Sequence, residues 1–146
     1  MQTAPLTPEQ QNWLRTNTYL PVIVLAIVLL FLVGIFICLF VGLAGNPFFI
    51  GFTILAGILL LAVTAAVGLH IYNHAMDLKD GVAQICTAKL IRKHETSRAP
   101  RTFYAEFEEV GSVTVTYEDY EKLENSKLYR VTYSPHTKRG WKIEEY

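Results

Sequence analysis

Two long stretches without a charged side chain dominate the first half of this 146-residue sequence. Residues 20–45 carry no charge, and residues 47–69 are equally apolar, interrupted only by Thr53 and Thr64. A helix needs about 20 such residues to cross the hydrocarbon core of a bilayer. Because hydrocarbon offers no hydrogen bonds to the backbone, a helix is the expected form of each segment. The sequence therefore predicts two transmembrane helices, over about residues 20–45 and 47–72.

The connection between the two stretches is so short that they are expected to form an antiparallel helical hairpin. It consists of a Gly-Asn-Pro turn at residues 45–47 and has no cation, whereas Arg15 precedes the first helix and Lys79 follows the second. Excess Lys and Arg mark the cytoplasmic side. We expect both termini to be cytoplasmic, in a bacterial-type inner or plasma membrane. The alternative for the first stretch is a cleaved signal peptide, but such peptides have an apolar region of about 7–15 residues behind several cations.

The distribution of charged residues along the sequence divides the chain into parts. Of 13 basic and 13 acidic residues, only Arg15 and Glu9 lie before Met76. We therefore expect three segments: an N-terminal interfacial segment over residues 1–19, the hairpin over residues 20–75, and a soluble β-rich domain over residues 76–146.

The interfacial segment begins with a helix-start pattern. Thr7 and Gln10 are spaced for a capping box, with Pro8 in the first turn. The pattern predicts a short helix that carries Trp13 along the membrane surface. Pro21 is then expected to bend the chain into the first span.

The second half of the sequence changes to the alternating pattern of half-buried strands. Strands are expected over residues 82–92, 103–107, 113–117, 129–133 and from residue 141, with a short helix over residues 118–124. The order of three strands, a helix and two strands is typical of a five-stranded OB-like β-barrel. An SH3-like barrel is the alternative. The arrangement of membrane helices followed by a small barrel resembles that of the NfeD-like membrane proteins; the resemblance lies in the arrangement alone and implies no site residue.

Small residues form one stripe on each apolar segment. At 3.6 residues per turn they share a narrow face, and such faces let helices approach closely in lipid. The stripes consist of Gly34, Cys38, Gly42 and Gly45 on the first segment and Thr53, Gly57, Thr64 and Gly68 on the second. Two interpretations stay open: the stripes face each other within the hairpin, or they contact another chain.

His70 and His74 are the most specific candidate for chemistry. Their spacing of one helical turn points both imidazoles the same way, and imidazole is a common ligand of zinc, copper and haem iron. Asp77 follows three residues later and could join them. The alternative is a polar, partly hydrated end of the second span.

Between residues 89 and 101 the sequence is basic, with Glu95 the only acid. The cations are Lys89, Arg92, Lys93, Arg98 and Arg101. They suit anionic lipid headgroups. A solvated loop whose charges offset the acidic run over residues 106–124 is the alternative. The balanced charge of the domain disfavours nucleic acid.

Motifs of phosphate-binding loops, zinc proteases, nucleophile elbows and paired-cysteine metal sites are absent from the sequence. We therefore expect no enzyme activity and no bound cofactor. The leading hypothesis is an assembly, accessory or interaction subunit whose β-domain binds further copies of the chain or other membrane-protein subunits. The alternatives are a metal- or haem-binding membrane module that uses His70 and His74, and an anionic-lipid-binding regulator.

Overall fold

The computed structural model describes residues 2–43, 46–97 and 99–146. The chain forms two compact units. One is the helical unit Arg15–Ala75. The other, the β unit, combines the residues up to Leu14 with Met76–Tyr146. The N-terminal segment thus belongs to the same unit as the C-terminal half, although it stands far from it in the sequence.

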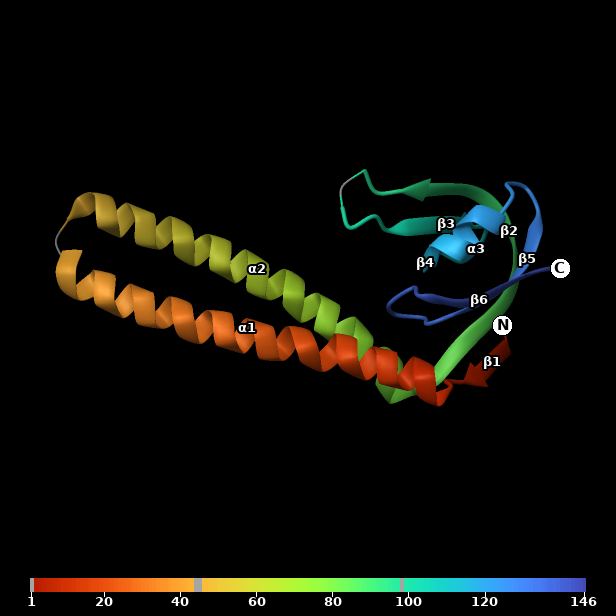
Figure 1. Ribbon diagram of the computed structural model, residues 1–146, viewed down its shortest axis with the longest axis horizontal. Coiled ribbons are helices and arrows are strands. Elements are labelled where there is room, and N and C mark those ends of the chain that lie inside the picture. Colours follow the sequence, from red (N-terminus) through yellow and green to blue (C-terminus); the bar gives the residue numbers. More distant parts are fainter. Residues whose placement is uncertain (1, 44–45, 98) are drawn as a thin grey trace. The chain divides into compact units, whose positions relative to one another are not determined.

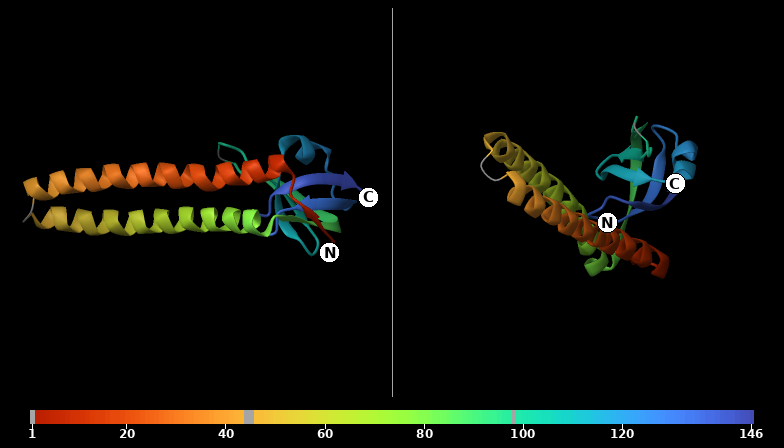
Figure 2. Two further views of the ribbon diagram at one scale, coloured as in Figure 1. Left: turned by 90° about the horizontal axis from the view of Figure 1, so that it is seen from below. Right: turned by 60° about the vertical axis from the view of Figure 1, so that its left-hand side comes forward.

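Two long helices, α1 (Pro8–Leu43) and α2 (Pro47–Asp80), run antiparallel to each other (Figures 1 and 2). Both are long and apolar enough to cross a membrane. The predicted capping box is confirmed: the Thr7 N–H donates to Gln10 Oε1 at 3.0 Å, and the Gln10 N–H donates to Thr7 Oγ1 at 3.3 Å. Asn46 caps α2 by accepting the N–H of Phe48 on its side-chain oxygen, at 3.0 Å. Gly45, the first residue of the predicted Gly-Asn-Pro turn, lies outside the described residues.

The N-terminal segment does not form the separate interfacial helix that the sequence suggested. α1 continues through Pro21 without a break. A proline removes one backbone hydrogen bond, but apolar helices tolerate it where the freed carbonyl finds another partner. At its other end α2 extends to Asp80, beyond the predicted span, so that only Gly81 separates it from the first residue of the next strand.

The β unit contains the predicted succession of three strands, a helix and two strands. These are β2 (Val82–Glu95), β3 (Phe103–Phe107), β4 (Gly111–Val115), α3 (Tyr117–Lys122), β5 (Leu128–Tyr133) and β6 (Gly140–Glu145). A further strand, β1 (Gln2–Pro5), was not predicted and pairs with the start of β2. The six strands form one antiparallel sheet in the order β4-β3-β2-β5-β6, with β1 beside β2.

This sheet is not closed. The strands and their succession along the chain agree with the prediction, but the closure into a barrel is not confirmed. Among the described residues, the end strands of the order meet at one isolated parallel bridge, between Thr114 and Arg139. There the Thr114 N–H donates to the carbonyl oxygen of Lys138 at 2.8 Å. Gly140 follows directly, and a Cβ on it would lie 3.1 Å from Val113 Cγ1. The two strands therefore approach closely where Gly140 lies.

The core lies on the inner face of the curved sheet. β2 bends between the part that pairs with β5 and the part that pairs with β3 (Figure 1). Its register with β3 shifts between Leu90 and Arg92. The bend lets one strand serve both halves of the sheet. The largest fully buried side chains of this core are Tyr133, Phe107, Leu90, Val113 and Val131. Burial of each such side chain contributes about 1.5–3 kcal/mol.

A second, smaller cluster joins the N-terminal segment to the β unit. Buried Leu6, Leu14 and Ala83 pack with the partly buried Trp13 and Trp141, and with Leu78. The two tryptophan rings meet edge to face, with centroids 5.4 Å apart. These apolar contacts explain why the segment up to Leu14 belongs to the β unit.

Candidate functional site

The histidine pair has the geometry that its spacing predicts. The His70 and His74 rings lie with centroids 4.2 Å apart and planes tilted by 43°. His74 is buried, and its Nδ1 lies 2.8 Å from the carbonyl oxygen of His70. A ring nitrogen bonded to a carbonyl is the usual support of a metal-binding imidazole. Two histidines supply only part of a metal site, however.

Asp77, which the sequence suggested as a further ligand, bonds to other partners in the structure. Its carboxylate is fully buried, with Oδ1 accepting the N–H of His136 at 2.9 Å and Oδ2 accepting the N–H of Thr137 at 2.8 Å. Both oxygens therefore hold the turn between β5 and β6. Within the described ranges, no group of three or more His, Cys, Asp or Glu side chains is placed to bind a metal ion.

The last turn of α2 makes a further contact with the same turn of the sheet. Asp80 Oδ2 lies 3.0 Å from His136 Nε2, and both side chains are partly exposed. Beyond His136, the indole N–H of Trp141 donates to Ser134 Oγ at 2.8 Å. The sequence did not predict these contacts between the end of α2 and the β5–β6 turn, because single Asp, Ser and Trp residues form no recognisable sequence motif.

Three cations of the basic run have protein partners. Arg92 Nε pairs with Glu106 Oε2 at 2.5 Å, and Arg101 lies 3.7 Å from Glu95. Lys93 Nζ donates to the carbonyl oxygens of Tyr120 and Leu123, at 2.9 and 2.8 Å.

Lys93 therefore stabilises the C-terminal end of α3, where carbonyl groups lack helical partners. Lys89 is exposed on β2, and Arg98 lies outside the described residues. Lipid binding by this run stays a prediction, and the partners seen here agree with the alternative of charges that offset the acidic strands.

Among the described residues, members of the two small-residue stripes line different hollows of the helical unit. A crevice of about 500 Å³ between the helices is lined on α2 by residues that include Thr53 and Gly57. On α1 its lining consists of bulky side chains: Leu32, Val33, Phe36, Ile37, Phe40 and Val41. Gly34 and Cys38 instead line a separate depression formed by α1 alone.

The glycines of both stripes have room around them. A Cβ added at Gly34, Gly57 or Gly68 would meet no atom within 4 Å. Thr64 bonds to its own helix through the carbonyl of Leu60. Gly45 and the surroundings of Gly42 lie outside the described part of the chain.

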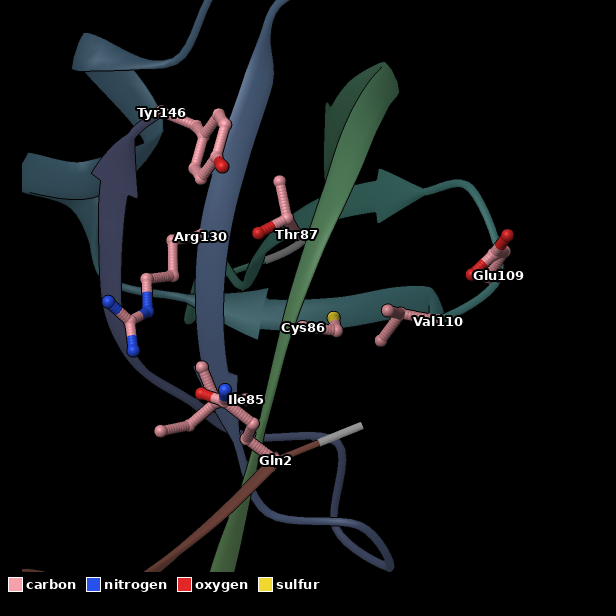
Figure 3. A pocket seen from close by; sticks show the side chains of 8 residues that line it. All are labelled: Gln2, Ile85, Cys86, Thr87, Glu109, Val110, Arg130 and Tyr146. Atoms are coloured by element: carbon pink, nitrogen blue, oxygen red, sulfur yellow. The ribbon is translucent and has the colours of Figure 1, made fainter.

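A polar pocket of about 450 Å³ opens beside β2 (Figure 3). Its lining comes from β1, β2, β5, the β3–β4 turn and the C-terminus: Gln2, Ile85, Cys86, Thr87, Glu109, Val110, Arg130 and Tyr146. It lies where one edge of β2 passes from its pairing with β1, which ends at Ile85, to its pairing with β3, which begins at Leu90.

Among the described residues, neither β1 nor β3 pairs with β2 at Thr87, beside this pocket. The Leu90 N–H bonds to Lys127 on the β5 side. In an antiparallel ladder successive residues point their backbone groups to opposite edges, so those of Thr87 point away from β5, into the gap. Burial, and secondarily the charge of Glu109, raise the pKa of the Cys86 thiol in the same pocket. A raised pKa argues against a reactive nucleophile.

Comparison with protein-family models, with curated proteins and with solved structures finds no match to this chain.

Proposed function

We propose that this chain is a non-enzymatic integral membrane protein that acts as an assembly or accessory subunit. One observation supports the proposal: among the described residues, Gly34 and Cys38 line a depression formed by α1 alone, and a Cβ added at Gly34 would meet no atom within 4 Å. Other membrane-protein subunits or further copies of the chain are the proposed partners.

The physical reason lies in how helices associate in lipid. Apolar side chains gain little from contact with each other there, because lipid tails are equally apolar. Close approach along small residues, with its many van der Waals contacts, supplies the attraction instead. The hairpin packs bulky α1 side chains toward α2 and leaves the small-residue face outside, where a second chain can reach it.

We further propose that the β unit is an OB-like barrel at the cytoplasmic surface. The strand order, the helix between β4 and β5, and the parallel bridge between Thr114 and Arg139 all support this over an SH3-like barrel. The cation distribution supports cytoplasmic termini in a bacterial-type inner or plasma membrane. The edge of β2 at Thr87, with which no described strand other than β5 pairs, offers a partner one place to pair with the sheet.

Cys38 provides the test, because it lies on the proposed contact face and is the only cysteine in the apolar segments. The full chain carrying Cys86→Ser is inserted in membranes and oxidised with copper phenanthroline. We expect a disulfide-linked dimer that disappears with Cys38→Ser. Gly34→Leu should abolish the cross-link, since the larger side chain keeps the helices apart.

The matched control is Gly51→Leu, the same change on α2 at a position that is equally open but off the small-residue stripe. It should leave the cross-link intact. Recovery of the unaltered protein from mild detergent as a lone monomer, measured by light scattering, would refute the assembly role.

The close ring contact of His70 and His74 supports a second candidate function, binding of haem or a metal ion. In this case the purified full chain should contain iron, copper or zinc, and His74→Ala should remove it. Metal analysis and absorption spectra that show neither metal nor haem would eliminate this candidate.

A further inference from the structure

We propose that Arg139, Trp13 and Trp141 form a binding site for the phosphate group of an anionic phospholipid. Arg139 Cζ lies 5.1 Å from the centroid of the Trp13 ring. Trp141 meets Trp13 edge to face on the same cluster. Arg139 Nε is buried and has no hydrogen-bond partner in the described structure. This site is independent of the helix contact proposed above.

The guanidinium of Arg139 lacks a counter-ion. It takes part in none of the ion pairs among the described residues, unlike Arg92 and Arg101. The charge of Asp119 acts on Arg139 without forming one of these ion pairs, and Asp119 Oδ2 accepts the Thr116 hydroxyl at 2.7 Å. A partly buried charge without a partner is unfavourable, so the site favours an added anion.

The charge state and shape of the group fit a phosphate. Burial lowers the pKa of Arg139, an effect that Asp119 partly opposes. Arginine nevertheless remains protonated under physiological conditions. Its planar fork of donors matches two phosphate oxygens, and the Trp13 face stabilises the cation further.

The position of Trp13 in the sequence favours a lipid as the source of that phosphate. Trp13 lies on α1 about two helical turns before Leu20, where the apolar stretch begins. Tryptophan is enriched at the headgroup level of membranes. Lys93 and Arg92, in the basic run, are by contrast already bound to protein acceptors.

The two tryptophans of the site are the only ones in the chain, so their fluorescence reports on it directly. The full chain is reconstituted in phosphatidylcholine vesicles that contain a minor fraction of brominated phosphatidylglycerol or, in parallel, brominated phosphatidylcholine. We expect stronger quenching by the brominated anionic lipid. Arg139→Gln should weaken the apparent preference for that lipid about tenfold, the effect of losing one charge-assisted contact.

Arg92→Gln is the matched control, because it removes the same charge from an exposed position of the β unit. It should keep the preference; an equal loss in both variants would show unspecific charge attraction and overturn the proposal. Inorganic phosphate added to the same vesicles that contain phosphatidylglycerol separates the two sources of phosphate. If it blocks the preference for phosphatidylglycerol, the ligand is free phosphate and the lipid site is refuted.

Two further measurements distinguish the loss of the Arg139 charge from misfolding of the variant. Native mass spectrometry of the unaltered protein should show more bound phosphatidylglycerol than phosphatidylcholine, and equal binding would refute the proposal without any variant. Arg139→Lys keeps the charge and should retain part of the preference. A preference lost equally in the Lys and Gln variants, with circular dichroism unchanged, would contradict a role for the charge.

Discussion

The buried carboxylate of Asp77 is expected to hold the β5–β6 turn in place. Its two oxygens accept the backbone N–H groups of His136 and Thr137, at 2.9 and 2.8 Å. A hydrogen bond to a charged group contributes about 1.5–3 kcal/mol. Asp77→Ala removes both acceptors, and since the turn is only partly buried, water can replace some of the loss. We expect the turn to lose about 3 kcal/mol of local stability.

Hydrogen–deuterium exchange of the full chain in detergent measures this loss directly. A factor of ten corresponds to about 1.4 kcal/mol, so amides over residues 134–140 should exchange roughly a hundredfold faster in Asp77→Ala. Peptides from β3 and β4 should change much less, because local opening does not require the core to unfold.

Asp80→Ala is the control for this experiment. Asp80 contacts the same turn through His136, but both side chains of that pair are more than one-third exposed. Such pairs contribute about 0–1 kcal/mol. Equal acceleration in the two variants, or no acceleration in Asp77→Ala, would refute the assignment of the turn to the buried carboxylate.

Three further predictions concern the β unit. Gly140→Val should destabilise the full chain by about 1–3 kcal/mol in thermal unfolding, because its side chain would collide with Val113 where β4 and β6 meet. Lys93→Met should cost about 1.5–3 kcal/mol and speed amide exchange in α3, since two carbonyl oxygens at the end of that helix lose their donor. Cys86 in a Cys38→Ser background should react slowly with iodoacetamide near neutral pH, and faster as the pH rises, because its raised pKa leaves little thiolate. Glu109→Gln should speed that reaction, as the neighbouring negative charge that raises the pKa is gone.

Local patterns predicted most of the secondary structure. Strands β3 and β4 follow from strict alternation, in which Phe107 and Val113 point inward and are buried. The helix α3 follows from its acidic first turn, and its N-cap Thr116 accepts the N–H of Asp119. In both cases the signal lies within a few neighbouring residues, so no knowledge of the rest of the fold is needed.

Strand β1 could not be predicted from its own residues. Gln2–Pro5 shows no alternation and ends in a proline, a poor strand residue. Its pairing depends on β2, which lies far along the chain, and on the packing of Leu6 and Leu14 in the smaller cluster. Such a strand forms because it pairs with the edge of a distant strand. The sequence of the segment itself gives no information about that edge.

The same distinction applies to the charged residues, and here it affects the interpretation of function. As sequence, Lys93 and Arg92 form part of a conspicuous basic run, while Arg139 lies in a shorter group with Lys138 and Lys142. In the structure Lys93 caps a helix and Arg92 pairs with an acid, whereas Arg139 lies over Trp13 and forms no ion pair within the described ranges. The density of cations in a sequence therefore measures how many are present, but the availability of each for a ligand depends on partners from distant segments. On that physical ground, Arg139 is a better candidate for binding an anion than the basic run over residues 89–101.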